Sequence, residues 1–169
     1  MVTRNSVNTY TVPTTANEVT MPAQPAFLGV LSGTDSNVTG NGAAYTVGTN
    51  TAFTEIFDQN ADFNVNGTFT APVTGRYMLV VNIQMDNVAA GMTTGVFDIV
   101  TSNRTYNVLN LNPLVMIDAS TNDLALESNA IADMDTADTA YCSITISGGV
   151  GNTVDLETAG TFFCGKLIC

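Results

Sequence analysis

The clearest pattern of apolar and polar positions in this chain runs from Arg76 to Met85, where apolar side chains recur at every second residue. A period of two places successive side chains on opposite faces of a β-sheet. One face of this strand is wholly apolar and consists of Tyr77, Leu79, Val81, Ile83 and Met85. The other face is mixed, because Met78 and Val80 accompany polar neighbours on it. In an antiparallel protein, a strand with apolar residues on both faces predicts that a second subunit covers the mixed face.

Turn signals divide the rest of the chain into short strands. The Asn66-Gly67 pair separates two strand-like segments, 62–65 and 68–71, and is a strong hairpin signal because both residues tolerate positive φ. The same criteria predict strands at 26–31, 52–57, 95–101, 106–111, 141–147 and 162–168, with less regular segments at 113–117 and 124–134. About ten short strands with regularly spaced turns predict an all-β, ten-stranded antiparallel sandwich.

The composition favours the same fold class and a single domain. Charged residues make up 11% of the 169 residues, against about 25% in ordinary domains, so Thr, Asn and the 14 Gly supply much of the surface and the turns. Residues 25–169 are long enough to bury a core of their own. Residues 1–24 show no strong alternation and are interrupted by Pro13 and Pro22, which predicts an extended arm that packs on another protein or subunit; a disordered terminus is the alternative.

The net charge of -11 limits the partners that the chain can bind. With only four Lys and Arg residues, the protein would be repelled by nucleic-acid phosphates and by anionic membranes. The start of the chain has no apolar signal region, and no apolar run approaches the roughly 20 residues of a membrane span. We therefore expect synthesis in the cytoplasm, with no nucleic-acid and no membrane partner.

The segment from Phe57 to Tyr77 resembles the globular head of complement component 1q, a member of the tumour-necrosis-factor-like jelly rolls. The matching residues are Phe57-Asp58, Asn66-Gly67, Phe69, Ala71-Pro72, Gly75 and Tyr77. Towards the C-terminus the resemblance continues, although Ala137 replaces the usual Gly and Lys166 stands where the family has an apolar residue. The resemblance spans roughly residues 25–168, and it implies a trimeric, non-catalytic jelly roll.

The resemblance also implies which residues form the trimer. In such trimers the outer face of the sheet that holds the long strand and the final strand packs around a threefold axis. Carried over by motif, Met78 and Val80 would face that axis, joined by Phe163 and Leu167 of the final strand. The alternative is a one-residue slip that places these residues inside the sandwich and their neighbours outside.

Catalytic and metal sites find little support in the sequence. The chain has no His, which removes Ser-His and Cys-His nucleophiles, and the glycines do not form a phosphate-binding motif, so we expect no enzyme and no cofactor. Cys142, Cys164 and Cys169 are expected to be free thiols, the first two as small core residues. Asp133, Asp135 and Asp138 are weak candidates for calcium ligands, with a solvated acidic loop as the alternative.

These observations favour a viral structural protein that decorates a capsid and grips the shell with its N-terminal arm. Arm residues expected to make this contact are Val7, Tyr10, Val12 and Pro13. The expected partners are two further copies of the chain and the capsid or other virion proteins, and the expected location is the virion surface. A receptor-binding knob of a phage fibre and a cellular complement-like ligand-binding head remain as alternatives.

Overall fold

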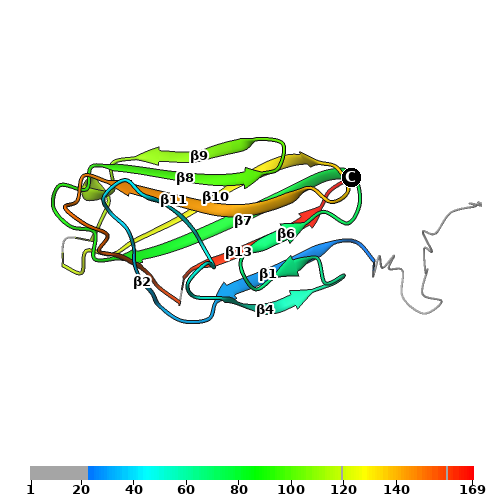
Figure 1. Cartoon of the computed structure of the whole chain (residues 1–169), viewed down its shortest axis with the longest axis horizontal. Helices are drawn as coiled ribbons and strands as arrows, with labels where there is room; N and C mark the ends of the chain where they lie inside the picture. Colours follow the sequence, from blue (N-terminus) through cyan, green and yellow to red (C-terminus); the bar gives the residue numbers. More distant parts are fainter. Residues whose placement is uncertain (1–22, 119, 159) are drawn as a thin grey trace, which may run out of the picture.

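The computed structural model describes residues 23–118, 120–158 and 160–169 and shows two antiparallel β-sheets packed face to face (Figure 1). The seven-stranded sheet contains β1 (Ala26–Leu31), β2 (Asp35–Thr39), β4 (Phe53–Asp58), β7 (Gly75–Asp86), β10 (Leu124–Met134), β12 (Val154–Leu156) and β13 (Phe162–Leu167). The six-stranded sheet contains β3 (Ala44–Thr46), β5 (Phe63–Asn64), β6 (Thr68–Thr70), β8 (Thr94–Thr101), β9 (Thr105–Leu111) and β11 (Thr139–Ser147). The all-β jelly-roll sandwich predicted from the sequence is confirmed.

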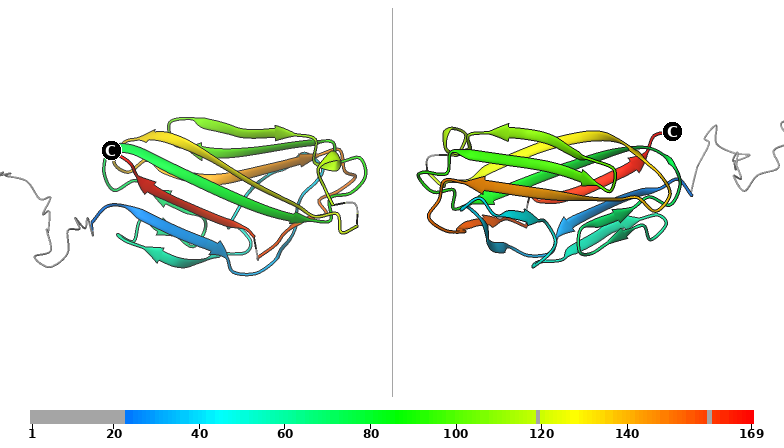
Figure 2. Two further views of the ribbon diagram at one scale, coloured as in Figure 1. Left: turned by 180° about the vertical axis from the view of Figure 1, so that it is seen from behind. Right: turned by 45° about the horizontal axis from the view of Figure 1, so that its top comes forward.

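Strand β7 organises the seven-stranded sheet. It pairs with β10 on one side and with β13 and β12 on the other, and β1 and β4 continue the sheet beyond β13 (Figure 2). The five alternate residues from Tyr77 to Met85 are all buried between the sheets, as their apolar pattern predicted. Burial of such side chains stabilises the fold by roughly 1.5–3 kcal/mol each.

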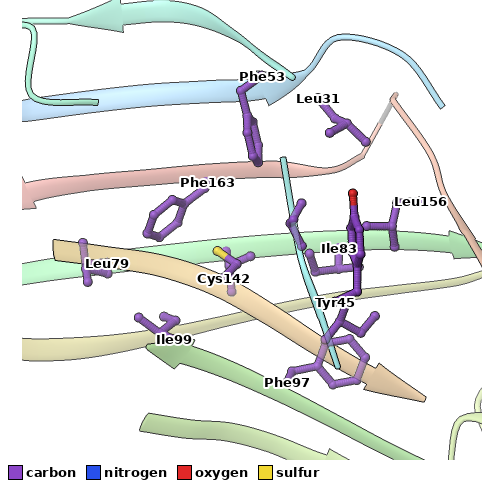
Figure 3. Close-up of a cluster of buried hydrophobic side chains, with 14 of the residues drawn as sticks. Leu31, Tyr45, Phe53, Leu79, Ile83, Phe97, Ile99, Cys142, Leu156 and Phe163 are labelled. Atoms are coloured by element: carbon purple, nitrogen blue, oxygen red, sulfur yellow. The ribbon is translucent and has the colours of Figure 1, made fainter. Parts of the chain in front are cut away.

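An aromatic cluster fills one half of the space between the sheets. The Phe27 ring stacks on the rings of Phe63 and Phe69, with centroids 4.7 Å away in each case, and meets Phe163 edge-on at 5.1 Å. These four residues come from β1, β5, β6 and β13, so the cluster joins strands of both sheets. Figure 3 shows Phe53 and Phe163 together with aliphatic side chains that continue the core.

The residues of the family-like segment have structural roles. Asp58 accepts a hydrogen bond from the Phe63 backbone N at 2.8 Å and so sets the corner between β4 and β5. Gly67 has a φ of 86°, and a Cβ there would collide with the Val47 carbonyl oxygen. The Tyr77 hydroxyl donates to the Val73 carbonyl at 2.7 Å and closes the turn that precedes β7. The motif therefore encodes turns and core packing.

Some strand assignments made from the sequence are wrong. The described residues form thirteen strands, not ten, because β2, β3 and β12 were not predicted. These three strands are only three to five residues long, too short to show a period. The segment 113–117 contains a 3-10 turn, Pro113–Val115, instead of a strand. Ala137 has a φ of 75°, which explains why Gly is usual at this position in the family that the segment resembles.

The two ends of the described chain lie at the same pole of the sandwich (Figure 1). The Gln24 side-chain amide donates to the Leu167 carbonyl at 2.6 Å, and the Arg76 backbone N donates to the Cys169 carbonyl at 2.7 Å. Loops such as 87–93 and 148–153, which follow β7 and β11, lie at the opposite pole. In the described ranges no helix has the length and apolar character needed to span a bilayer.

Candidate self-association surface

The outer face of the seven-stranded sheet, turned away from the core, is a continuous mixed surface. On β7 it presents Met78, Val80, Asn82 and Gln84, all partly exposed. The pairing registers bring Leu28 of β1 and Cys164 of β13 into line with Val80, and Phe57 of β4 lies next to Leu28. An apolar row thus crosses four strands in a single chain, although the core is complete without it.

A groove of about 250 Å³ lies along this row. It is lined by Ala26, Phe27, Leu28, Phe57, Met78, Val80, Cys164, Gly165 and Lys166. Small side chains explain the hollow, since Ala26 of β1 and Cys164 of β13 lie on the two strands between β4 and β7. Phe57 is 48% exposed at the rim of the groove. Large exposed apolar side chains around a hollow are typical of a surface that another protein covers.

The outer face carries both cations and acids. Lys166 is exposed and lies opposite Met78 in the β13–β7 pairing. Strand β10 carries Glu127 and Asp133 on the same face, opposite Asn82 and Arg76 of β7 respectively. On this face Lys166 is thus the cation at the groove, Asp133 lies opposite Arg76, and Glu127 lies on the β10 edge opposite a neutral residue.

Cys142 and Cys164 are poorly suited to nucleophilic chemistry. Burial raises the pKa of the Cys142 thiol well above its usual range. Burial, with a smaller contribution from Glu127, also raises the pKa of the Cys164 thiol. Both thiols are therefore protonated at neutral pH, whereas a reactive cysteine needs its thiolate. The expectation that Cys164 is a core residue is wrong, because it lines the groove on the outer face.

The structure separates the four residues that the sequence had grouped as an interface. Met78 and Val80 lie on the outer face and line the groove. Phe163 is 0% exposed and belongs to the aromatic cluster, and Leu167 packs against the core, so their placement on the outer face is wrong. The register gives the reason, since Phe163 pairs with Val81 and Leu167 with Tyr77, two inward-facing residues.

Adjacent phenylalanines caused this error. Phe162 and Phe163 are equally apolar, so alternation alone cannot decide which of them faces inward. The neighbouring Gly165 decides it, because a Cβ at that position would stand 2.7 Å from Leu79 Cδ2 and 2.8 Å from Phe27 Cε1. The core requires a residue without a side chain there, and this places Phe163 inside.

The weak calcium candidates do not converge. No group of three or more His, Cys, Asp or Glu side chains within the described ranges could hold a metal ion. The Asp138 carboxylate instead accepts hydrogen bonds from Ser102 Oγ at 2.9 Å, Asn103 Nδ2 at 2.6 Å and the Asp135 backbone N at 2.7 Å. These bonds lower the pKa of Asp138, and the bond from the Asp135 backbone N contributes most. The Asp138 carboxylate therefore stabilises the turn that precedes β11.

The remaining predicted site residues lie in the N-terminal arm. Val7, Tyr10, Val12 and Pro13 fall outside the described residues. Sequence reasoning also missed Leu28, Phe57 and Ile131, which carry much of the apolar outer face. The alternation in 26–31 could have placed Leu28 on the outer face. Phe57 and Ile131 could not be placed in this way, because they join the outer face through strand neighbours that are distant in sequence.

Comparison with known proteins identifies the architecture. No family model and no curated protein matches the chain. Among solved structures, the globular domain of zebrafish complement 1qA is 18% identical, with a TM-score of 0.53, and the match covers 86% of this chain and 98% of that one. This chain has the complement 1q and tumour necrosis factor jelly-roll fold.

Two further structures give the same result for this jelly roll. Murine APRIL is 11% identical with a TM-score of 0.57, and the match covers 86% of this chain and 99% of that one. The Eiger TNF structure from S. frugiperda is 12% identical with a TM-score of 0.56, covering 86% and 93% respectively. Identities this low establish the fold, and the function has to be argued from the surface of this chain.

Proposed function

We propose that this chain acts as a non-catalytic homotrimer that assembles through the outer face of the seven-stranded sheet. The single observation that carries the proposal is the apolar groove with Val80, Met78 and Leu28 in its lining. A monomer would leave this surface in water, and covering it is favourable by about 25 cal/mol per Å² of apolar area. The likeness of the outer strands to complement-type heads, in which this face meets a threefold axis, supports three copies over two.

Replacing Val80 by Asp is expected to dissociate the trimer. The substitution would place a carboxylate in the groove of every copy, where contact with the neighbouring copy removes its water without supplying a partner, and a buried uncompensated charge costs several kcal/mol. Native mass spectrometry or light scattering at micromolar concentration measures the change. The wild-type chain is expected to be trimeric and the variant monomeric.

The matched control is Val150→Asp. Val150 is a fully exposed valine in the loop between β11 and β12, at the pole away from both described ends. This variant makes the same chemical change without touching the outer face and should remain trimeric. A Val80→Asp protein that stays trimeric, or a wild-type chain that is monomeric, would contradict the proposal.

We also propose that the trimer decorates a viral capsid, with residues 1–24 as its attachment. Cyclic symmetry places equivalent segments at the same height along its axis, so three arms would leave one end of a trimer together. Three linked weak contacts can bind far more strongly than one. Three observations support this proposal. Ala23 lies at the pole where the chain enters the sandwich, so residues 1–24 lead to that pole. Residues 1–24 include apolar side chains that could pack on a shell, and the acidic net charge suits a basic shell.

Removal of residues 1–24 tests this attachment. The shortened chain, 25–169, is expected to keep the jelly roll and the trimer, because Phe27 to Phe163 build the core cluster and Ala26 to Lys166 line the groove. Of the described contacts, the cut removes the hydrogen bonds of Ala23 and Gln24. It should fail to co-sediment with the particles that carry the full chain. Continued binding to the shells would overturn capsid attachment while leaving the trimer proposal intact.

The distribution of copies separates decoration from its alternatives. A decorating protein should cover the shell in electron micrographs of the particle, whereas a phage fibre knob should appear at fibre tips only. A complement-like ligand-binding head should be found on neither.

A further inference from the structure

We propose that Ile131 of one copy inserts into the outer-face groove of the next copy. The inference rests on the proposed trimer and deepens it by naming the residue that fills the groove. Ile131 is 60% exposed, although it is a large apolar side chain in a regular strand. Its place on the outer face follows from the register of β10, in which it lies opposite Met78 and next to the inward-facing Ala132.

Ile131 does not fill the groove of its own chain. It is not among the residues that line the groove, whose walls come from β4, β1, β13 and β7. Strand β10 lies on the far side of β7 from β13 (Figure 2). Two strand spacings separate β10 from β13, which is about 10 Å. One outer face thus carries an apolar projection at its β10 edge and an apolar hollow near its centre.

The charges around the projection and the hollow are complementary. Lys166 is the charged residue among those that line the groove, and its neighbours across the strands are Ala26 and Met78. Glu127 lies on the same face of β10 as Ile131 and opposite Asn82, a neutral residue. Glu127 lies four residues from Ile131, about 13 Å along the strand, so a second copy that places Ile131 in the groove brings this acid towards Lys166 in one direction of β10 and away from it in the other. Such complementarity favours one orientation of the contact.

The proposed trimer requires each copy to offer Ile131 to one neighbour and its groove to the other. Such a contact is heterologous, and it closes as a ring when the rotation that relates neighbouring copies closes. A twofold dimer would instead place the Ile131 of each copy in the groove of the other, so covalent trimers, and not dimers alone, are the expected product of linking this contact.

Disulfide formation tests the contact, because Cys164 already lies in the groove. The test protein carries Ile131→Cys together with Cys169→Ser, which removes the exposed thiol, while Cys142 stays buried. Oxidation should give covalent dimers and trimers on a non-reducing gel, and nothing larger. A bond within one chain is excluded, because about 10 Å between the strands exceeds the roughly 4.4–6.8 Å that separates the Cα atoms of a disulfide.

Two controls identify the bond. Adding Cys164→Ser should abolish all covalent species, and dimers that persist would show a contact between two copies of residue 131, which overturns the proposal. Val115→Cys, an exposed site in the 3-10 turn, should stay unlinked in the Cys169→Ser protein.

Native mass of the unoxidised test protein separates this inference from the proposed function. If the Ile131→Cys protein is trimeric but its introduced thiol stays unlinked on oxidation, the Ile131 contact is overturned and the trimer stands. A wild-type chain that is monomeric overturns both.

Discussion

Replacing Phe27 by Ala is expected to lower the free energy of unfolding by about 3–5 kcal/mol, the usual cost of truncating a buried aromatic residue. Phe27 stacks on Phe63 and Phe69 and meets Phe163 edge-on, so its removal opens a cavity between the sheets. All four rings lie on strands of six residues or fewer and depend on each other for packing. The cavity should therefore weaken the packing of both sheets.

The measurement is urea unfolding in the Val80→Asp background, because oligomer dissociation would otherwise add to the unfolding free energy. Phe57→Ala in the same background is the matched control. Phe57 loses the same atoms from the adjoining strand but is about half exposed, so its loss should be much smaller. Equal effects of the two substitutions would show that the aromatic cluster does not stabilise the core.

Replacing Tyr45 by Phe should cost about 1–3 kcal/mol, because it removes a hydrogen bond that links the two sheets. Tyr45 lies on β3 of the six-stranded sheet, and its hydroxyl donates to Asp35 on β2 of the seven-stranded sheet. Asp35 is 2% exposed, so the substitution deprives a buried carboxylate of this donor. The Asn50 backbone N, which donates to the same hydroxyl at 3.0 Å, loses its acceptor.

The Tyr45 contribution should disappear in alkali. Burial raises the pKa of Tyr45 above its ordinary value of about 10, and the hydrogen bond to Asp35 raises it further. A raised folded-state pKa means that the folded protein holds this proton more tightly than the unfolded chain. The stabilisation is therefore complete below about pH 10 and declines as the pH rises above it.

Urea unfolding at neutral pH and at several values above about pH 10 measures both effects. The difference in stability between wild type and Tyr45→Phe should shrink as the pH rises. Tyr141→Phe, at a partly buried position on β11, is the matched control, because it removes a tyrosine hydroxyl that is not the one bonded to Asp35. A difference between wild type and Tyr45→Phe that is constant with pH would contradict the role assigned to the Tyr45 hydroxyl.

The sequence was most informative where one long strand is buried on a single face. Ten alternating residues in β7 predict its register, because a slip of one position would expose all five inward side chains. The Asn66-Gly67 turn was equally reliable, since the backbone conformation there favours Gly. Both patterns lie within one short segment, so the strand and the turn can be predicted without knowing which strands pair with them.

The inward face of β13 and the groove on the outer face could not be predicted from the sequence, because both depend on contacts between segments that are distant in the chain. The inward face of β13 is fixed by Gly165 beneath Leu79 and Phe27, which no pattern within 162–168 reveals. The groove needs four strands in register, and its proposed counterpart Ile131 is the one large apolar side chain among the five exposed positions of β10. The sequence therefore predicted that Met78 and Val80 lie on the outer face, but not which residues surround them.

The shared pole of the two described ends has a practical consequence for labelling. A reporter fused after Cys169 would sit beside the place where the chain enters β1, because Gln24 bonds to the Leu167 carbonyl there, and it would crowd the attachment proposed for residues 1–24. A reporter inserted in the loop between β11 and β12, which holds the exposed Val150, would instead occupy the opposite pole and leave that junction open.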